Sequence, residues 1–97
     1  MNMQKLLQQA QNMQEKMQRE LAETSVESSV GGGLVRVTMD GHKHLLSVKV
    51  DPEAVDEDDL SMLEDLIAAA VNDASRKIDE TLKDKVGSLT SGLPGLF

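Results

Sequence analysis

The spacing of apolar residues changes twice along this chain of 97 residues, and no other feature constrains its fold as strongly. In residues 1–23, apolar positions recur every three or four residues, which is the period of one helix face. Between residues 24 and 50 they alternate with polar positions, as in a half-buried strand. The helical spacing returns after residue 60. The sequence therefore predicts an α+β fold in the order helix, three strands, helix.

The middle of the chain contains three short alternating segments, Val26–Val30, Val35–Met39 and Leu46–Val50. Three glycines, Gly31-Gly32-Gly33, separate the first two segments. Asp40-Gly41 predicts a two-residue hairpin turn between the second and third. Asp51-Pro52 ends the last strand, because proline cannot donate a ladder hydrogen bond. Short turns between successive strands indicate an antiparallel meander.

The second helical segment has a broad apolar face, typical of a helix that covers a sheet. Its members are Leu63, Leu66, Ile67, Ala70, Val71, Ala74, Ile78 and Leu82. We expect the helix to end at Gly87, so that residues 1–87 form a single domain. Residues 88–97, which include Gly92, Pro94 and Gly95, are expected to form a flexible tail.

The first helical segment has only a narrow apolar stripe, formed by Met3, Leu7, Ala10, Met17 and Leu21. Gln14 lies in line with it, and the pattern is typical of a coiled-coil seam. A three-stranded sheet also leaves two edges unpaired, which proteins usually protect. Both features predict a homodimer with the stripe in its interface. In the alternative, a monomer, Met3 and Leu7 would share a buried layer with Ile78 and Leu82.

The sequence lacks the patterns of common catalytic and metal sites. Gly31-Gly32-Gly33 is not followed by the Lys-Ser/Thr and helix of a phosphate loop. His42 and His44 have no third metal ligand nearby. Asp56–Asp59 lacks the spacing of a calcium loop and is better explained as helix capping. We therefore expect no enzyme activity, no cofactor, no bound metal and no small-molecule substrate.

Composition restricts the compartment and the partners. The chain has no cysteine, hence no disulfides, and no apolar run near the ~20 residues that span a bilayer, so we expect a cytoplasmic protein without membrane contact. The net charge is −7, but it is unevenly spread. Residues 1–23 are neutral, residues 24–50 carry +1, and residues 51–97 carry −8 from twelve acids and four bases. Any site for a polyanion must therefore be local.

One flank of the first helical segment is polar and basic, and lies off the apolar stripe: Lys5, Gln8, Asn12, Lys16 and Arg19. Lysine and arginine are the usual partners of phosphate groups, and glutamine and asparagine can read base edges. A solvated helix face without a partner gives the same pattern, so the flank by itself leaves both readings open.

The central block of the chain closely resembles the YbaB/EbfC family of bacterial nucleoid-associated proteins. The resemblance rests on Gly32-Gly33-Leu34-Val35-Arg36-Val37, Gly41, Val48-Lys49-Val50-Asp51-Pro52 and the stretch from Met62 to Ala74, MLEDLIAAAVNDA. The opening helix, rich in glutamine and methionine, and Leu93-Pro94-Gly95 are similar as well. The resemblance implies an intertwined homodimer of α-β-β-β-α protomers whose paired helices project like tweezers around duplex DNA. It also implies a place in the nucleoid, an altered DNA conformation and effects on gene expression.

With DNA as the implied partner, the basic residues become candidate contacts. They are Lys5, Lys16 and Arg19 with Gln8 and Asn12 in the first helix, and Arg76, Lys77, Lys83 and Lys85 in the second. Arg36, Lys43 and Lys49 are second choices. Tyrosine and tryptophan are absent, which favours a duplex over a stacked single strand. A dimeric adaptor that binds another protein, and not DNA, is the alternative function.

Overall fold

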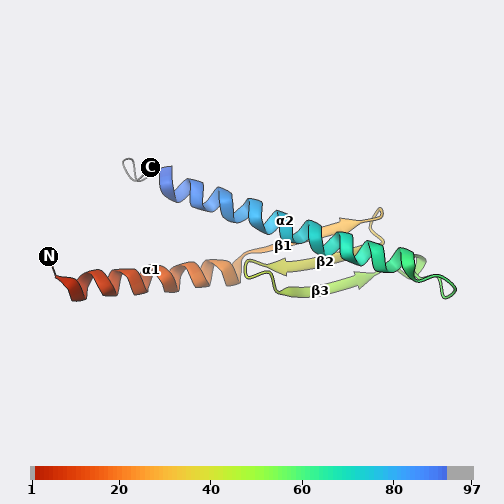
Figure 1. Ribbon diagram of the computed structural model, residues 1–97, viewed down its shortest axis with the longest axis horizontal. Coiled ribbons are helices and arrows are strands. Elements are labelled where there is room, and N and C mark those ends of the chain that lie inside the picture. The colour runs from red at the N-terminus through yellow and green to blue at the C-terminus, as the bar shows by residue number, and fades with distance from the viewer. Residues whose placement is uncertain (1, 92–97) are drawn as a thin grey trace.

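The computed structural model describes residues 2–91, with side chains described as far as Lys85, and its elements follow the predicted order (Figure 1). They are α1 (Met3–Glu23), β1 (Ser25–Val30), β2 (Val35–Asp40), β3 (Leu45–Val50), the 3-10 turn η1 (Pro52–Ala54) and α2 (Ser61–Ser91). The α+β class and the α-β-β-β-α order are confirmed. The molecule is long and thin, with extents of 69 × 24 × 16 Å.

The three strands form an antiparallel sheet in the order β1-β2-β3, as the short turns predict. Val37, in the centre of β2, lies opposite Ser28 of β1 and Val48 of β3. The pairing of β2 with β3 shifts by one residue between Thr38 and Met39. Such a bulge increases the local twist of the sheet next to the β2–β3 turn.

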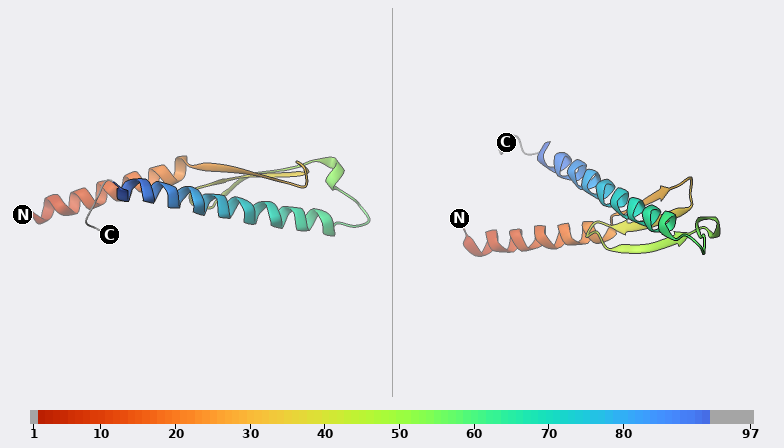
Figure 2. Two further views of the ribbon diagram at one scale, coloured as in Figure 1. Left: turned by 90° about the horizontal axis from the view of Figure 1, so that it is seen from above. Right: turned by 45° about the vertical axis from the view of Figure 1, so that its right-hand side comes forward.

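Helix α2 crosses one face of the sheet and makes the hydrophobic core with it (Figures 1 and 2). Three side chains of β2 and three of α2 are fully or almost fully buried against one another: Val35, Val37, Met39, Ala70, Ala74 and Ile78. The alternation in β2 and the four-residue spacing in α2 place these six on facing surfaces. Leu63, Leu66, Ile67, Val71 and Leu82 pack at the margin, so the predicted apolar face of this helix is confirmed.

Strand β3 keeps an uncovered apolar strip on the same side of the sheet as α2. Val48 and Val50 lie opposite Val37 and Val35, and cross-strand partners share a face. Helix α2 packs over β1 and β2, however, and leaves β3 beside it. Leu46, Val48 and Val50 are therefore 56%, 42% and 38% exposed.

The turn between β2 and β3 differs from the prediction, since it contains three residues and not two. The carboxylate Oδ1 of Asp40 accepts the backbone N–H groups of His42 and His44, each at 2.9 Å. Lys43 adopts a left-handed conformation with φ of 65°. This arrangement is the three-residue loop with a left-handed last residue. The Asp-Gly pair indicated the wrong turn because its glycine contacts the end of α1 instead of forming a two-residue turn.

Gly41 attaches the carboxyl end of α1 to the hairpin. The backbone N–H of Gly41 donates to the carbonyl oxygens of Leu21, at 2.9 Å, and Thr24, at 3.0 Å. A Cβ atom on Gly41 would lie 2.5 Å from the Leu21 oxygen and 2.9 Å from its Cα. Only glycine allows the end of α1 to approach the hairpin this closely.

Helix α2 ends later than expected, at Ser91 and not at Gly87. A glycine within a helix costs only about 1 kcal/mol relative to alanine, which a long helix tolerates. Residues 88–91 of the predicted tail therefore belong to α2. Residues 92–97, with Leu93-Pro94-Gly95, lie outside the described residues.

The approach of Gly41 to Leu21 predicts a strong effect of a single methyl group. We expect Gly41→Ala to destabilise the protein by about 1–3 kcal/mol, because backbone atoms cannot move aside as a side chain can. Urea unfolding monitored by circular dichroism measures the change. Gly32→Asn is the control, since a Cβ there meets nothing within 4 Å and asparagine tolerates the positive φ of 70°. Equal stability of the Gly41→Ala and Gly32→Asn variants would contradict the prediction.

Candidate nucleic-acid interface

Helix α1 projects from the body of the molecule, with its amino end far from the sheet (Figure 1). Asn2 caps it by accepting the backbone N–H of Gln4 at 3.0 Å, and none of its residues, Met3–Glu23, is buried. The radius of gyration is 19.1 Å, against about 13 Å for a compact domain of 100 residues. The chain thus extends a long helix that its own fold does not cover.

The predicted interface residues of α1 lie on this uncovered helix. Met3, Leu7 and Met17 are 72%, 61% and 44% exposed, whereas Ile78 of α2 is fully buried. The monomer alternative, which placed Met3 and Leu7 in one buried layer with Ile78, is therefore wrong for this protomer. The stripe is also wider than predicted, because Leu6 and Met13, seven residues apart, are exposed beside it. Their heptad spacing was visible in the sequence.

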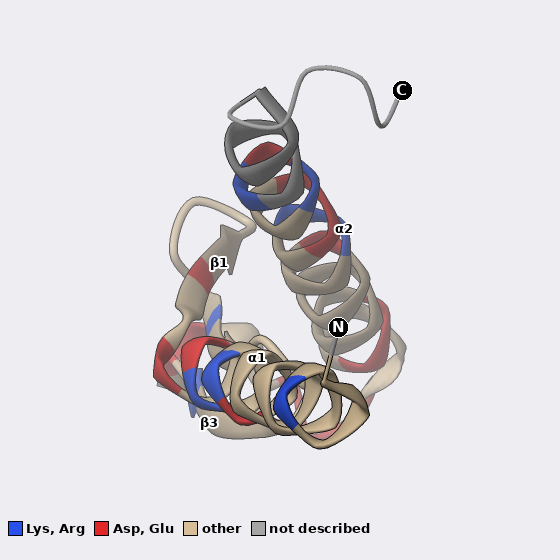
Figure 3. Cartoon of the chain, turned by 90° about the vertical axis from the view of Figure 1, so that its left-hand side faces the viewer, with Lys and Arg blue, Asp and Glu red and all other residues tan. Residues whose placement is uncertain are grey.

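The predicted polar flank of α1 is exposed along its whole length, from Lys5 through Gln8, Asn12 and Lys16 to Arg19. At 3.6 residues per turn, this flank and the apolar stripe lie on opposite sides of the helix. Glu15 belongs to the same flank. Figure 3, viewed from the end to which both helices project, shows acidic and basic residues interspersed along them.

The four predicted contacts in α2 do not form one group. Arg76 and Lys77 both face Asp73, with nitrogen–oxygen distances of 2.7 and 3.5 Å. Lys77 also donates to the carbonyl oxygen of Glu27 in β1, at 3.0 Å. Lys77 thereby links α2 to the sheet, whereas Arg76 pairs within its own helix, and both cations are partly neutralised. They are poorer partners for phosphate than their positions in the sequence indicated.

The other two predicted contacts in α2, Lys83 and Lys85, differ in whether they are already bonded within the chain. The Nζ atom of Lys85 donates to the Thr24 hydroxyl at 2.7 Å, which ties α2 to the junction of α1 and β1. Lys83 is exposed, and within residues 2–85 it makes no ion pair or side-chain hydrogen bond. Of the α2 set, Lys83 is thus the one left for a partner.

Asp73 is the centre of the polar contact between α2 and β1. The hydroxyl of Ser28, which is fully buried, donates to Asp73 Oδ2 at 2.7 Å. This hydrogen bond is the main reason why the pKa of Asp73 lies below its usual value, and Lys77 and Arg76 lower it further, while desolvation opposes them. The ionised carboxylate is therefore part of the fold.

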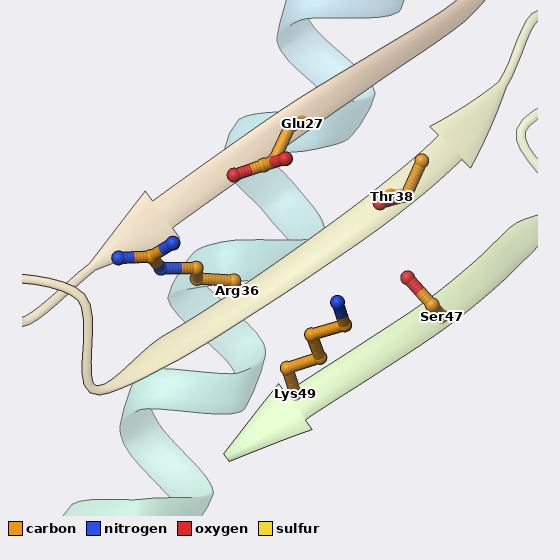
Figure 4. A pocket seen from close by; sticks show the side chains of 5 residues that line it. All are labelled: Glu27, Arg36, Thr38, Ser47 and Lys49. Atoms are coloured by element: carbon orange, nitrogen blue, oxygen red, sulfur yellow. The ribbon is translucent and has the colours of Figure 1, made fainter. Parts of the chain in front are cut away.

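The sheet face turned away from α2 has a small polar hollow of about 70 Å³. Its lining comes from all three strands: Glu27, Arg36, Thr38, Ser47 and Lys49 (Figure 4). Arg36 lies directly opposite Lys49, and Thr38 directly opposite Ser47. Lys43, the other second-choice residue, is paired with Asp79 at 2.9 Å beyond the far end of β2.

The two histidines of the β2–β3 turn lie near each other, with ring centroids of His42 and His44 5.8 Å apart. Within the described part of the chain, no three or more histidine, cysteine or acidic side chains gather closely enough to hold a metal ion. Across those residues, no helix combines the length and apolar character needed to cross a membrane.

Comparison with known sequences and structures gives one consistent result. The sequence profile described as the YbaB/EbfC DNA-binding family matches residues 1–93. A nucleoid-associated protein of Chloroflexus aurantiacus is 48% identical over 100 aligned positions, covering all of both chains. One of Acidobacterium capsulatum is 50% identical, covering 98% of this chain and 95% of that protein.

Among solved structures, the crystal structure of an uncharacterised protein from Helicobacter pylori is similar. Its TM-score is 0.67 at 21% identity, covering 87% of this chain and 98% of the other. At that identity the similarity concerns the fold alone.

The lowered pKa of Asp73 predicts acid-dependent stability. A depressed pKa in the folded state stabilises the protein above the unfolded value, ~3.9, and this contribution is lost as pH falls through the folded pKa. We expect Asp73→Asn to be less stable than wild type near neutral pH, with the difference shrinking below about pH 4. Urea midpoints measured across this range test it.

Asp65→Asn removes an exposed carboxylate from the same helix. As the matched control, it should leave the pH dependence of wild type in place. A stability difference between wild type and Asp73→Asn that stays constant with pH would contradict the assignment.

Proposed function

Since the chain belongs to the YbaB/EbfC DNA-binding family, we propose that it performs its DNA-binding role in the nucleoid as a homodimer that holds duplex DNA on projecting helices and alters its conformation. The observation that carries this proposal is α1, a helix of 21 residues with no buried side chain. Most helical stability in proteins comes from packing of an apolar face, so a partner is expected to cover the apolar stripe of α1.

A second copy of the chain is the partner that best fits the apolar surfaces. The α1 stripe and the bare β3 strip of Leu46, Val48 and Val50 are both exposed in one protomer. Contiguous apolar surface of this kind is typical of an interaction site. A two-fold arrangement brings each such surface against its counterpart, and thereby covers both protomers at once.

The basic flank then remains available to DNA. With the stripe of α1 in the dimer interface, Lys5, Lys16 and Arg19 point to the other side of the helix, where Gln8 and Asn12 lie as well. The dimer presents this flank twice, at a spacing that its symmetry fixes, as dimeric DNA-binding proteins do for half-sites. Lys83 of α2 adds a further cation.

The charge balance of the chain supports DNA binding through local contacts to phosphate groups. The chain carries −7 overall, so distant parts of it repel DNA. The chain has one phenylalanine and neither tyrosine nor tryptophan, which leaves little surface for stacking unpaired bases. The duplex backbone, held by lysine and arginine, is the ligand that this surface fits.

The dimer is tested by placing a charge in the α1 stripe. A buried leucine contributes about 1.5–3 kcal/mol, and a dimer contains two copies of Leu7, so Leu7→Glu should weaken association by about 3 kcal/mol or more, over a hundredfold. Sedimentation equilibrium measures the dissociation constant. Gln8→Glu, the same charge change on the opposite flank, should leave the dimer intact. If the wild-type protein is monomeric at micromolar concentration, the dimer proposal is wrong.

The DNA contacts are tested by a salt titration with a short mixed-sequence duplex. We expect log affinity to fall linearly with log salt, with a slope near −0.9 for each phosphate contacted. Reversing two charges, Lys16→Glu with Arg19→Glu, should weaken binding and flatten the slope while the dimer persists. Glu15→Gln, on the same flank, should strengthen binding.

Two results would count against this proposal. Unchanged affinity of the Lys16→Glu, Arg19→Glu protein would remove α1 as the DNA contact. An absence of any wild-type binding at low salt would overturn DNA binding by this chain and favour the protein adaptor.

A further inference from the structure

The centre of the sheet face opposite α2 is polar, unlike the face that makes the core. Two cross-strand rows run across it, Ser29–Arg36–Lys49 and Glu27–Thr38–Ser47. Arg36 and Lys49 are exposed, and Thr38 and Ser47 are half-buried at the floor of the hollow. Figure 4 shows the long side chains of Arg36 and Lys49 rising from neighbouring strands on this one face.

The positions of the two cations on this face lower the stability of the sheet. Arg36 and Lys49 are direct cross-strand partners, and like charges in that position destabilise a sheet. Within residues 2–85, no carboxylate lies within 4.0 Å of either cation, whereas Arg76, Lys77 and Lys43 each have one. Arg36 and Lys49 thus repel each other without a compensating ion pair.

Hydroxyl groups surround the same point. Thr38 and Ser47 lie opposite each other in the next row, so two hydroxyls and two basic side chains line a hollow of about 70 Å³. The guanidinium of Arg36 lies next to Gly33. Arginine, lysine, serine and threonine are the side chains that most often donate to phosphate oxygens. An anion placed here would accept from several donors and relieve the repulsion between the cations.

We propose that the hollow of Glu27, Arg36, Thr38, Ser47 and Lys49 is a phosphate-binding site that takes a backbone phosphate of duplex DNA. The sheet is then a second contact surface beside the α1 flank, and the assignment rests on the proposed DNA-binding function. Glu27 is the one acid of the hollow, and it keeps the affinity of the site moderate. The set carries a net +1 in a chain of −7.

A protein partner fits this face less well. The centre of a protein–protein interface is usually apolar and depleted in charge, and the two rows contain no apolar side chain. The apolar surfaces of this protomer lie instead on the α1 stripe and on the β3 strip of the opposite sheet face. Dimer contact and phosphate contact are thereby assigned to different faces.

The test uses three single variants of the full chain and the same short duplex in a salt titration. Arg36→Gln and Lys49→Gln should each weaken binding, roughly eightfold at ~0.1 M salt for every phosphate that the variant no longer neutralises, and reduce the slope by about 0.9 per phosphate. Glu27→Gln should strengthen binding, a change of opposite sign that damage to the fold does not produce.

Lys43→Asn is the matched control. It removes one positive charge from the β2–β3 turn, from a lysine that is already paired with Asp79, and asparagine accepts the positive φ of 65°. At ~0.1 M salt, screening over about 10 Å should keep its effect within about twofold. Urea midpoints of all four variants verify that each is folded.

The outcomes separate this assignment from the proposed function. If wild type binds the duplex, and Arg36→Gln and Lys49→Gln bind it with the same affinity as Lys43→Asn, the phosphate site is overturned. The proposal of DNA binding then still stands. Weaker binding by Glu27→Gln also counts against the site. A wild-type chain that does not bind the duplex overturns the proposed function, and the site with it.

Discussion

The contact between two alanines of α2 and the valines of β2 determines how the second helix lies on the sheet. Ala70 and Ala74 are fully buried against Val35 and Val37, and such small side chains let the helix lie close to the central strand. A close helix over β2 is anchored on one side by Asp73, which binds Ser28 of β1. Helix α2 therefore covers β1 and β2, and the apolar side chains of β3 are left for another surface to cover.

The same placement separates the protomer into faces with different chemistry. One sheet face carries the core and the bare β3 strip, and the other carries the polar rows of Arg36 and Thr38. Helix α1 likewise has two chemically different sides, with its apolar stripe opposite its basic flank. Acidic residues are concentrated after residue 50, so the basic residues proposed to contact DNA lie mostly on the flank of α1 and on the open sheet face.

Much of the fold could be predicted, because its elements follow the two elementary periods of apolar residues. Helix and strand positions and the buried face of α2 follow from them, and the short turns add the strand order. Turn geometry and helix length could not be predicted in the same way. Asp40-Gly41 indicated a two-residue turn, but Gly41 serves contact with Leu21, which is 20 positions away in the sequence. The pairing of each basic residue could not be predicted either. Lys83 has Asp79 and Glu80 at the helical spacing at which Arg76 and Lys77 have Asp73, but of the three only Arg76 and Lys77 form an ion pair within the described residues.

The attachment of α1 at Gly41 has a mechanical consequence. The helix is held at its carboxyl end by two hydrogen bonds from one glycine N–H, and its 21 residues extend about 30 Å from there. A tilt of ~10° at that root moves the far tip by about 5 Å, a simple lever ratio for a rod of this length. In the proposed dimer, the distance between the two helix tips would therefore be set less by the helices than by the hairpin. If the proposed helices hold the duplex, a change in the hairpin sequence would alter which duplex widths and curvatures the protein accepts.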